Sequence, residues 1–67
     1  MKAIIKVSNL RSQSDVGTIR TALSNEEGII ACHIKKEKGE VDIVYDSYFI
    51  TLEKIQDLLD DMGYNVI

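Results

Sequence analysis

The 67-residue chain contains a single cysteine, no proline and no long apolar run. One cysteine permits no disulfide within the chain, which fits a reducing compartment such as the cytoplasm. No apolar stretch approaches the roughly 20 residues that a membrane-spanning helix needs, so membrane insertion is not expected. The first residues alternate charged and apolar side chains, which is a strand pattern and not the apolar segment of a signal peptide. We therefore expect a small cytoplasmic domain.

The charge distribution and the absent motifs exclude two function classes. The formal net charge is -3, whereas nucleic-acid binding requires a clustered basic surface. Lys35, Lys36 and Lys38 gather near a turn at Gly39, but Glu37 interrupts them, so a solvated turn is expected. The chain has no nucleophile–base pair, no paired catalytic carboxylates and no glycine loop for phosphate. Neither a nucleic-acid-binding protein nor an enzyme is predicted.

Hydrophobic periodicity predicts six elements in one domain, residues 1–67. The expected strands share an alternation of apolar side chains and cover residues 2–7, 29–36, 41–45 and, as a short edge strand, 64–67. The expected helices share apolar side chains at helical spacing and cover residues 12–24 and 51–62. This βαββαβ order predicts an α+β, ferredoxin-like sandwich, with two helices on one face of a four-stranded antiparallel sheet.

Cap residues mark the ends of both expected helices. Ser12 and Asp15 have the spacing of a capping box, so we expect the Ser12 hydroxyl to accept the Asp15 amide. The Asp15 carboxylate is expected to reach back or to interact with the positive end of the helix dipole. Thr51 is the expected N-cap of the second helix, and Gly63 suits a left-handed end of that helix.

A frame of residues spread along the whole chain resembles a known family. The frame consists of residues 7–16, Ile19, Ala22, Leu23, Gly28, Ile29, Tyr45, Asp46, Thr51, Ile55, Gly63 and Tyr64. It resembles the heavy-metal-associated domain family, which includes bacterial copper chaperones and the N-terminal modules of copper and cadmium ATPases. The family signature, Gly-Met-x-Cys-x-x-Cys, aligns without a gap from Asn9, and its two cysteines fall on Ser12 and Asp15.

The resemblance implies the family fold without the family's metal chemistry. Paired thiolates suit soft Cu(I), whereas the hydroxyl of Ser12 and the carboxylate of Asp15 do not. We therefore expect no metal at this loop and no cofactor. The alternative is a metal carrier with altered ligands, using Asp15 with Cys32 or His33, or a site shared between protomers. Cys32 and His33 are adjacent in a strand and should point to opposite faces, Cys32 into the core and His33 onto the open sheet face.

The resemblance also implies an interaction surface. The family meets its transport ATPase through the metal loop, the first helix and the aromatic residue that faces the loop. In this chain the matching positions are Leu10, Arg11, Ser12, Asp15 and Tyr64. The predicted function is a protein-docking or regulatory module linked to metal transport. Its expected partner is a metal-transport ATPase or a related protein, and the chain itself is expected to be a monomer or a weak homodimer.

Overall fold

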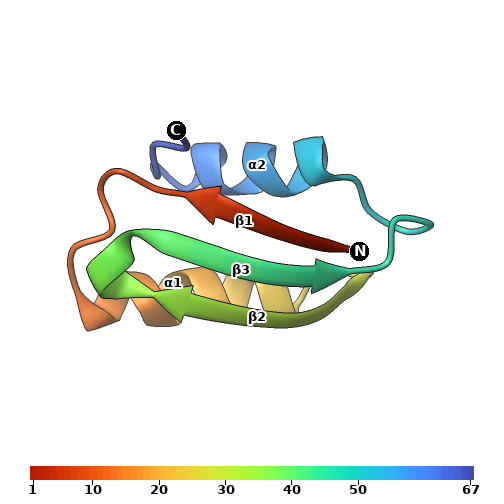
Figure 1. The fold of residues 1–67 in the computed structure, drawn as a ribbon, viewed down its shortest axis with the longest axis horizontal. Coiled ribbons are helices and arrows are strands. Elements are labelled where there is room, and N and C mark those ends of the chain that lie inside the picture. The colour runs from red at the N-terminus through yellow and green to blue at the C-terminus, as the bar shows by residue number, and fades with distance from the viewer.

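The computed structural model describes all residues, 1–67, as a three-stranded sheet with two α-helices (Figure 1). In chain order the elements are β1 (Lys2–Lys6), α1 (Gln13–Ser24), β2 (Ile29–Lys35), the 3-10 turn η1 (Lys36–Lys38), β3 (Glu40–Tyr45) and α2 (Leu52–Asp61). The strand order is β1-β3-β2, and both neighbouring pairs are antiparallel. Both helices pack on one face of the sheet, which confirms this part of the predicted ferredoxin-like arrangement.

One core lies between the sheet and the helices. Its fully buried side chains come from the inward positions of the strands and from one stripe of each helix, and the largest are Ile19, Leu23, Val41, Ile43, Ile55 and Leu59. Period two in the strands and helical spacing in the helices place these residues on facing surfaces. The opposite face of the sheet carries no helix.

The prediction of a fourth strand is wrong. Residues 64–67 contact β1 through a single antiparallel bridge between Val7 and Val66. Two further backbone hydrogen bonds flank that bridge, from Ser8 N–H to Asn65 and from Ile67 N–H to Lys6, each at 2.9 Å. The physical reason is that Gly63 and Tyr64 are used to close α2, so only three residues run beside β1. One bridge is too short to form a ladder.

The hairpin between β2 and β3 also differs in detail from the expected turn. β2 ends at Lys35, one residue before the predicted end, and η1 precedes Gly39, whose φ is 64°. A Cβ at Gly39 would lie 2.8 Å from the carbonyl oxygen of Val7, so glycine is required there. The register shifts between Ile29 and Ala31, an irregularity that apolar alternation alone does not predict.

Candidate functional site

The loop after β1 leads into a capped helix. Ser12 has an extended backbone, with φ -139° and ψ 166°, and its hydroxyl accepts the Asp15 N–H at 3.3 Å. The Asp15 carboxylate reaches back and accepts the Ser12 N–H at 3.1 Å. The predicted capping box is therefore confirmed in both directions, and it satisfies two of the backbone donors that a helix start leaves without partners.

The Asp15 carboxylate accepts more hydrogen bonds than a capping box requires. The oxygen that accepts the Ser12 N–H, Oδ2, also accepts the Arg11 N–H at 3.0 Å. The other oxygen, Oδ1, accepts the phenol O–H of Tyr64 at 2.9 Å, across 49 positions of sequence. One carboxylate thus joins the loop, the start of α1 and the segment that follows α2.

Tyr64 reaches Asp15 because of the way α2 ends. Gly63 has a φ of 91°, and its N–H bonds to the carbonyl of Asp60 at 2.9 Å. The N–H of Tyr64 bonds to the carbonyl of Leu59 at 3.0 Å, which completes a Schellman motif. The predicted left-handed glycine is confirmed. The motif turns the chain back toward the β1 loop and directs the Tyr64 side chain at Asp15.

Asn9 makes a second connection between the loop and the end of the chain, which sequence reasoning missed. Its side-chain amide donates to the carbonyl of Gly63 at 2.9 Å, and its side-chain oxygen accepts the N–H of Asn65 at 2.8 Å. The signal that could have revealed this role was the alignment itself, because Asn9 occupies the family's glycine position. Only a side chain with both a donor and an acceptor could bridge to backbone groups there.

The contact between Asp15 and Tyr64 shifts both titrations. The Arg11 N–H, followed by the Tyr64 hydroxyl, lowers the pKa of Asp15 below its usual range, because both donors stabilise the ionised carboxylate. Burial raises the pKa of Tyr64, and the hydrogen bond to Asp15 raises it further. The pair is therefore stable as a carboxylate and a neutral phenol across the neutral pH range.

The predicted interaction residues occupy different depths. Leu10 and Tyr64 are buried, with 8% and 7% of their surface exposed, whereas Arg11 and Ser12 are exposed and Asp15 is partly buried. The structure brings Ser12, Asp15 and Tyr64 into one hydrogen-bonded group, with Leu10 in the core. The solvent-facing part of the predicted surface is thus formed by Arg11, Ser12 and the edge of Asp15. Its role in docking stays a prediction.

The donors at the loop do not fit Cu(I). The side-chain donors of Ser12 and Asp15 are hard oxygen atoms, and both carboxylate oxygens of Asp15 already accept hydrogen bonds from within the chain. A soft ion requires thiolates or thioethers at these positions. At the two family ligand positions, the side chains therefore accept hydrogen bonds from backbone N–H groups and from a phenol O–H.

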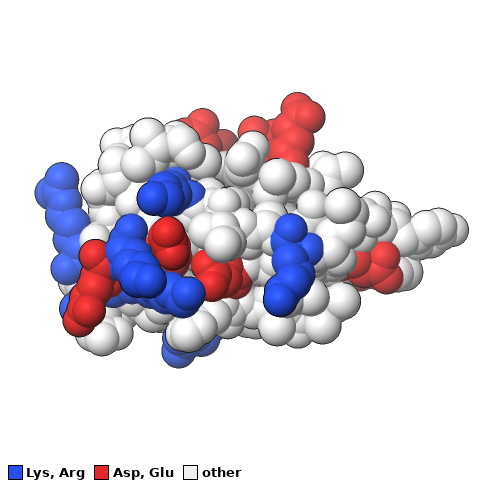
Figure 2. Space-filling model, viewed as in Figure 1, with Lys and Arg blue, Asp and Glu red and all other residues white.

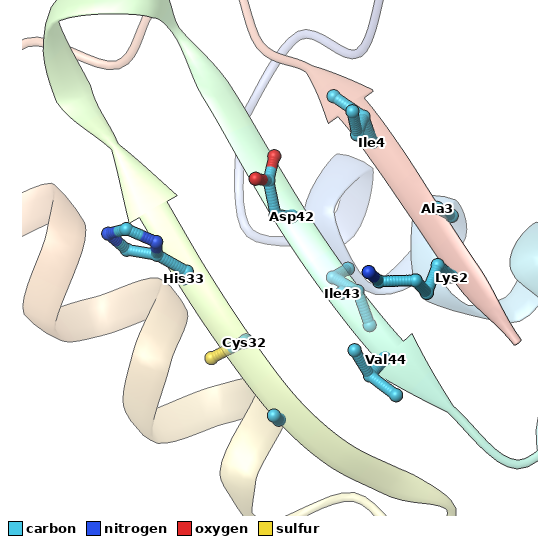
Figure 3. A pocket seen from close by; sticks show the side chains of 9 residues that line it. Lys2, Ala3, Ile4, Cys32, His33, Asp42, Ile43 and Val44 are labelled. Atoms are coloured by element: carbon cyan, nitrogen blue, oxygen red, sulfur yellow. The ribbon is translucent and has the colours of Figure 1, made fainter.

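The two remaining candidate ligands, Cys32 and His33, both lie in β2 and not in the loop. Cys32 lies opposite Ile43 and packs against the core, as its inward register predicts, but it is only partly buried and is not the fully buried core residue that was expected. His33 lies opposite Asp42, next to a shallow hollow on the open sheet face (Figure 3). Asp42 Oδ2 contacts Lys35 Nζ at 3.1 Å, and its Oδ1 is buried without a hydrogen-bond partner. No group of three or more His, Cys, Asp or Glu side chains converges in residues 1–67.

The sequence and the fold both match known proteins. The profile of the family described as heavy-metal-associated domain matches residues 4–65. The chain belongs to the heavy-metal-associated domain family. The copper chaperone CopZ of Bacillus subtilis strain 168 is 29% identical over 62 residues, which are 92% of this chain and 90% of that protein.

Solved structures of other proteins have the same fold. The CopZ metallochaperone superposes with a TM-score of 0.95 at 24% identity, over 100% of both chains. A copper-binding domain from HMA7, a P-type ATPase, superposes with a TM-score of 0.90 at 19% identity, over 98% of this chain and 92% of that one. These likenesses establish the ferredoxin-like fold. Neither helix of this chain combines the length and the apolar character needed to cross a membrane.

Proposed function

We propose that residues 1–67 form a single, non-enzymatic docking or regulatory domain linked to metal transport in the cytoplasm. The observation that supports it best is the Asp15 carboxylate, which accepts hydrogen bonds from Arg11, Ser12 and Tyr64. The family's metal loop is thereby held in a defined shape by the chain's own groups. A surface fixed in advance loses less conformational entropy when it binds a partner.

The proposed partner is the metal-binding domain of a P-type ATPase or a related protein. Two features support this choice. The chain belongs to a family whose solved members include a copper-binding domain from a P-type ATPase. The exposed Arg11 and Ser12 lie on the loop that carries the family's ligand positions, Ser12 and Asp15, where such a partner would be met. We propose that the free chain is a monomer or a weak homodimer.

A titration followed by NMR tests this proposal. The ¹⁵N-labelled chain is titrated with the metal-free copper-binding domain of a P-type ATPase, and amide shifts are expected at Arg11, Ser12 and Asp15 without added metal. Arg11→Glu should weaken binding, because it reverses the charge of an exposed loop residue. Lys54→Glu, which makes the same charge change at the start of α2, is the matched control and should bind as the wild type does.

The alternative outcomes are distinct. Shifts that spare the loop, or no binding at all, would contradict the docking proposal. Binding that requires Cu(I) or Zn²⁺ would instead support the metal carrier with altered ligands, since the partner would then recognise a loaded site.

A further inference from the structure

A second surface lies at the hairpin end of the sheet, in a groove between α1 and β2. Gln13 and Arg20 of α1 line one side of this groove, and Ile34, Lys36 and Lys38 line the other. Ile34 is buried and forms part of the floor, whereas Arg20 and Lys38 are exposed. The groove is separate from the hydrogen-bonded group at Asp15 and Tyr64, although both use the first half of α1.

The groove is positively charged in a protein whose net charge is -3. Figure 2 shows Lys and Arg side chains gathered over the hairpin end of the sheet, with a few acidic side chains among them. Arg20, Lys36 and Lys38 take part in neither of the two ion pairs of the structure, which involve Lys6 and Lys35. Glu37 is the single acidic residue of the lining. Three cations of the groove therefore lack an acidic partner within the chain.

The same groove contains a free strand edge. β2 pairs only with β3, so its other side has no neighbour. Tyr45 of β3 exchanges backbone hydrogen bonds with Met1, at the start of β1. Successive residues of a strand direct their backbone N–H and C=O groups to opposite sides. Every second residue of β3, counted from Tyr45, therefore forms hydrogen bonds with β1, and the residues between them form hydrogen bonds with β2. His33 lies opposite Asp42 and so bonds β3. The N–H and C=O groups of the next residue, Ile34, therefore point to the free edge.

We propose that this groove binds an extended acidic segment of a partner protein, which adds to β2 as a further strand. An exposed strand edge is a template for a peptide backbone, and the adjacent groove selects the peptide's alternate side chains. Carboxylates at every second position of the segment would face Arg20, Lys36 and Lys38. A nucleic acid also carries negative charge, but it lacks the alternating N–H and C=O groups that the edge of β2 matches. This site is independent of the docking role proposed for the loop.

A peptide titration tests the proposal on the intact chain. The probe is an acetylated and amidated peptide of alternating Glu and Val, and the expected result is amide shifts at Ile34 and Arg20. Arg20→Glu should lower the affinity by about tenfold, because it removes one attraction and adds a repulsion. Lys54→Glu is the matched control and should change the affinity by less than about twofold, since salt screens distant charges. Lys38→Glu provides a second groove variant, and circular dichroism verifies that each variant folds.

The backbone part of the proposal has its own control. The same peptide with methylated backbone nitrogens at alternate positions keeps its charge but cannot pair as a strand, so its binding should be lost. Equal binding of the methylated peptide would overturn strand addition.

Other outcomes would contradict other parts of the proposal. Amide shifts confined to the open sheet face or to the Asp15 loop would overturn the location of the site. Tighter binding of a single-stranded oligothymidine in competition would overturn the choice of a peptide. The variant Arg11→Glu should leave peptide binding intact, which separates a failure here from a failure of the loop's docking role.

Discussion

The N-termini of the two helices differ in the number of side-chain hydrogen bonds that stabilise them. At α2, Thr51 accepts the Lys54 N–H at 3.1 Å, and the third helical residue is a lysine that cannot reach back as an acceptor. At α1, Ser12 makes the same type of cap, and Asp15 adds a carboxylate that accepts from three donors. One cap is enough for the ten-residue helix α2.

The additional contacts at α1 therefore serve more than the start of a helix. They connect the loop at Arg11 with Tyr64 beyond α2, so they fix the relative positions of parts that are distant in sequence. Asp15 occupies the position of the family's second cysteine. In place of the family's metal-binding cysteine, this chain has a carboxylate that accepts hydrogen bonds from the backbone of the loop.

The largest expected loss of stability comes from the helix with a single cap. Thr51→Ala should lower the free energy of unfolding by about 0.5–2 kcal/mol, the usual range for a lost N-cap. Ser12→Ala should cost less within that range, because Asp15 still accepts the N–H groups of Arg11 and Ser12. Urea denaturation of the two variants and the wild type measures both losses. A larger loss for Ser12→Ala would show that Asp15 does not support the helix start independently.

The next effect concerns the bond across the molecule. Tyr64→Phe should lower the free energy of unfolding by about 1 kcal/mol, because it removes one hydrogen bond while keeping the ring in the core. Tyr48→Phe is the matched control, since Tyr48 is 87% exposed and its hydroxyl has no hydrogen bond within the chain. Thermal melts of both variants provide the comparison. Equal melting temperatures would mean that the Tyr64 hydroxyl contributes nothing to stability.

The smallest expected effect is a pH dependence specific to α1. The pKa of Asp15 is lowered in the folded chain. Its contribution to the free energy of unfolding is therefore complete at pH values above the ordinary carboxyl range, and it is lost as the pH falls through the pKa of the folded state. The pKa of Tyr64 is raised, so its contribution holds below the ordinary phenol range and is lost as pH rises through the folded value. The stability difference between the wild type and Asp15→Asn should therefore shrink in acid, below about pH 4. The loss caused by Thr51→Ala should stay constant there, and a parallel decline of both would contradict an origin at Asp15.

The sequence predicted what depends on local chemistry. Capping at Ser12 and Thr51 and the left-handed Gly63 follow from residue type and spacing, and the structure confirms them. The resemblance placed Tyr64 opposite the loop, but its hydrogen bond to Asp15 depends on the Schellman turn of α2 and on tertiary packing.

Features set by contacts between distant segments were missed. The bridges of Asn9 to Gly63 and Asn65 join residues more than 50 positions apart, which no local pattern encodes. The fourth strand was predicted because residues 64–67 suit an extended conformation. Propensity does not specify how many residues pair, and here the closure of α2 leaves one bridge to Val7.

The most direct test of the central claim is a Cu(I) competition titration of the wild type beside Ser12→Cys/Asp15→Cys. The claim is that hydrogen bonds to the chain's own carboxylate, Asp15, hold the loop at the family's metal-binding positions. The wild type should lose its Cu(I) to a competing chelator, and Cys32→Ala should abolish any weak residual binding. The double variant should retain about one Cu(I) per chain, because it restores the thiolate pair at the start of α1. Ser12→Ala/Asp15→Ala is the control for loop opening alone and should stay metal-free. A wild type that keeps one Cu(I) per chain against the chelator, or a folded double variant that binds none, would contradict the account.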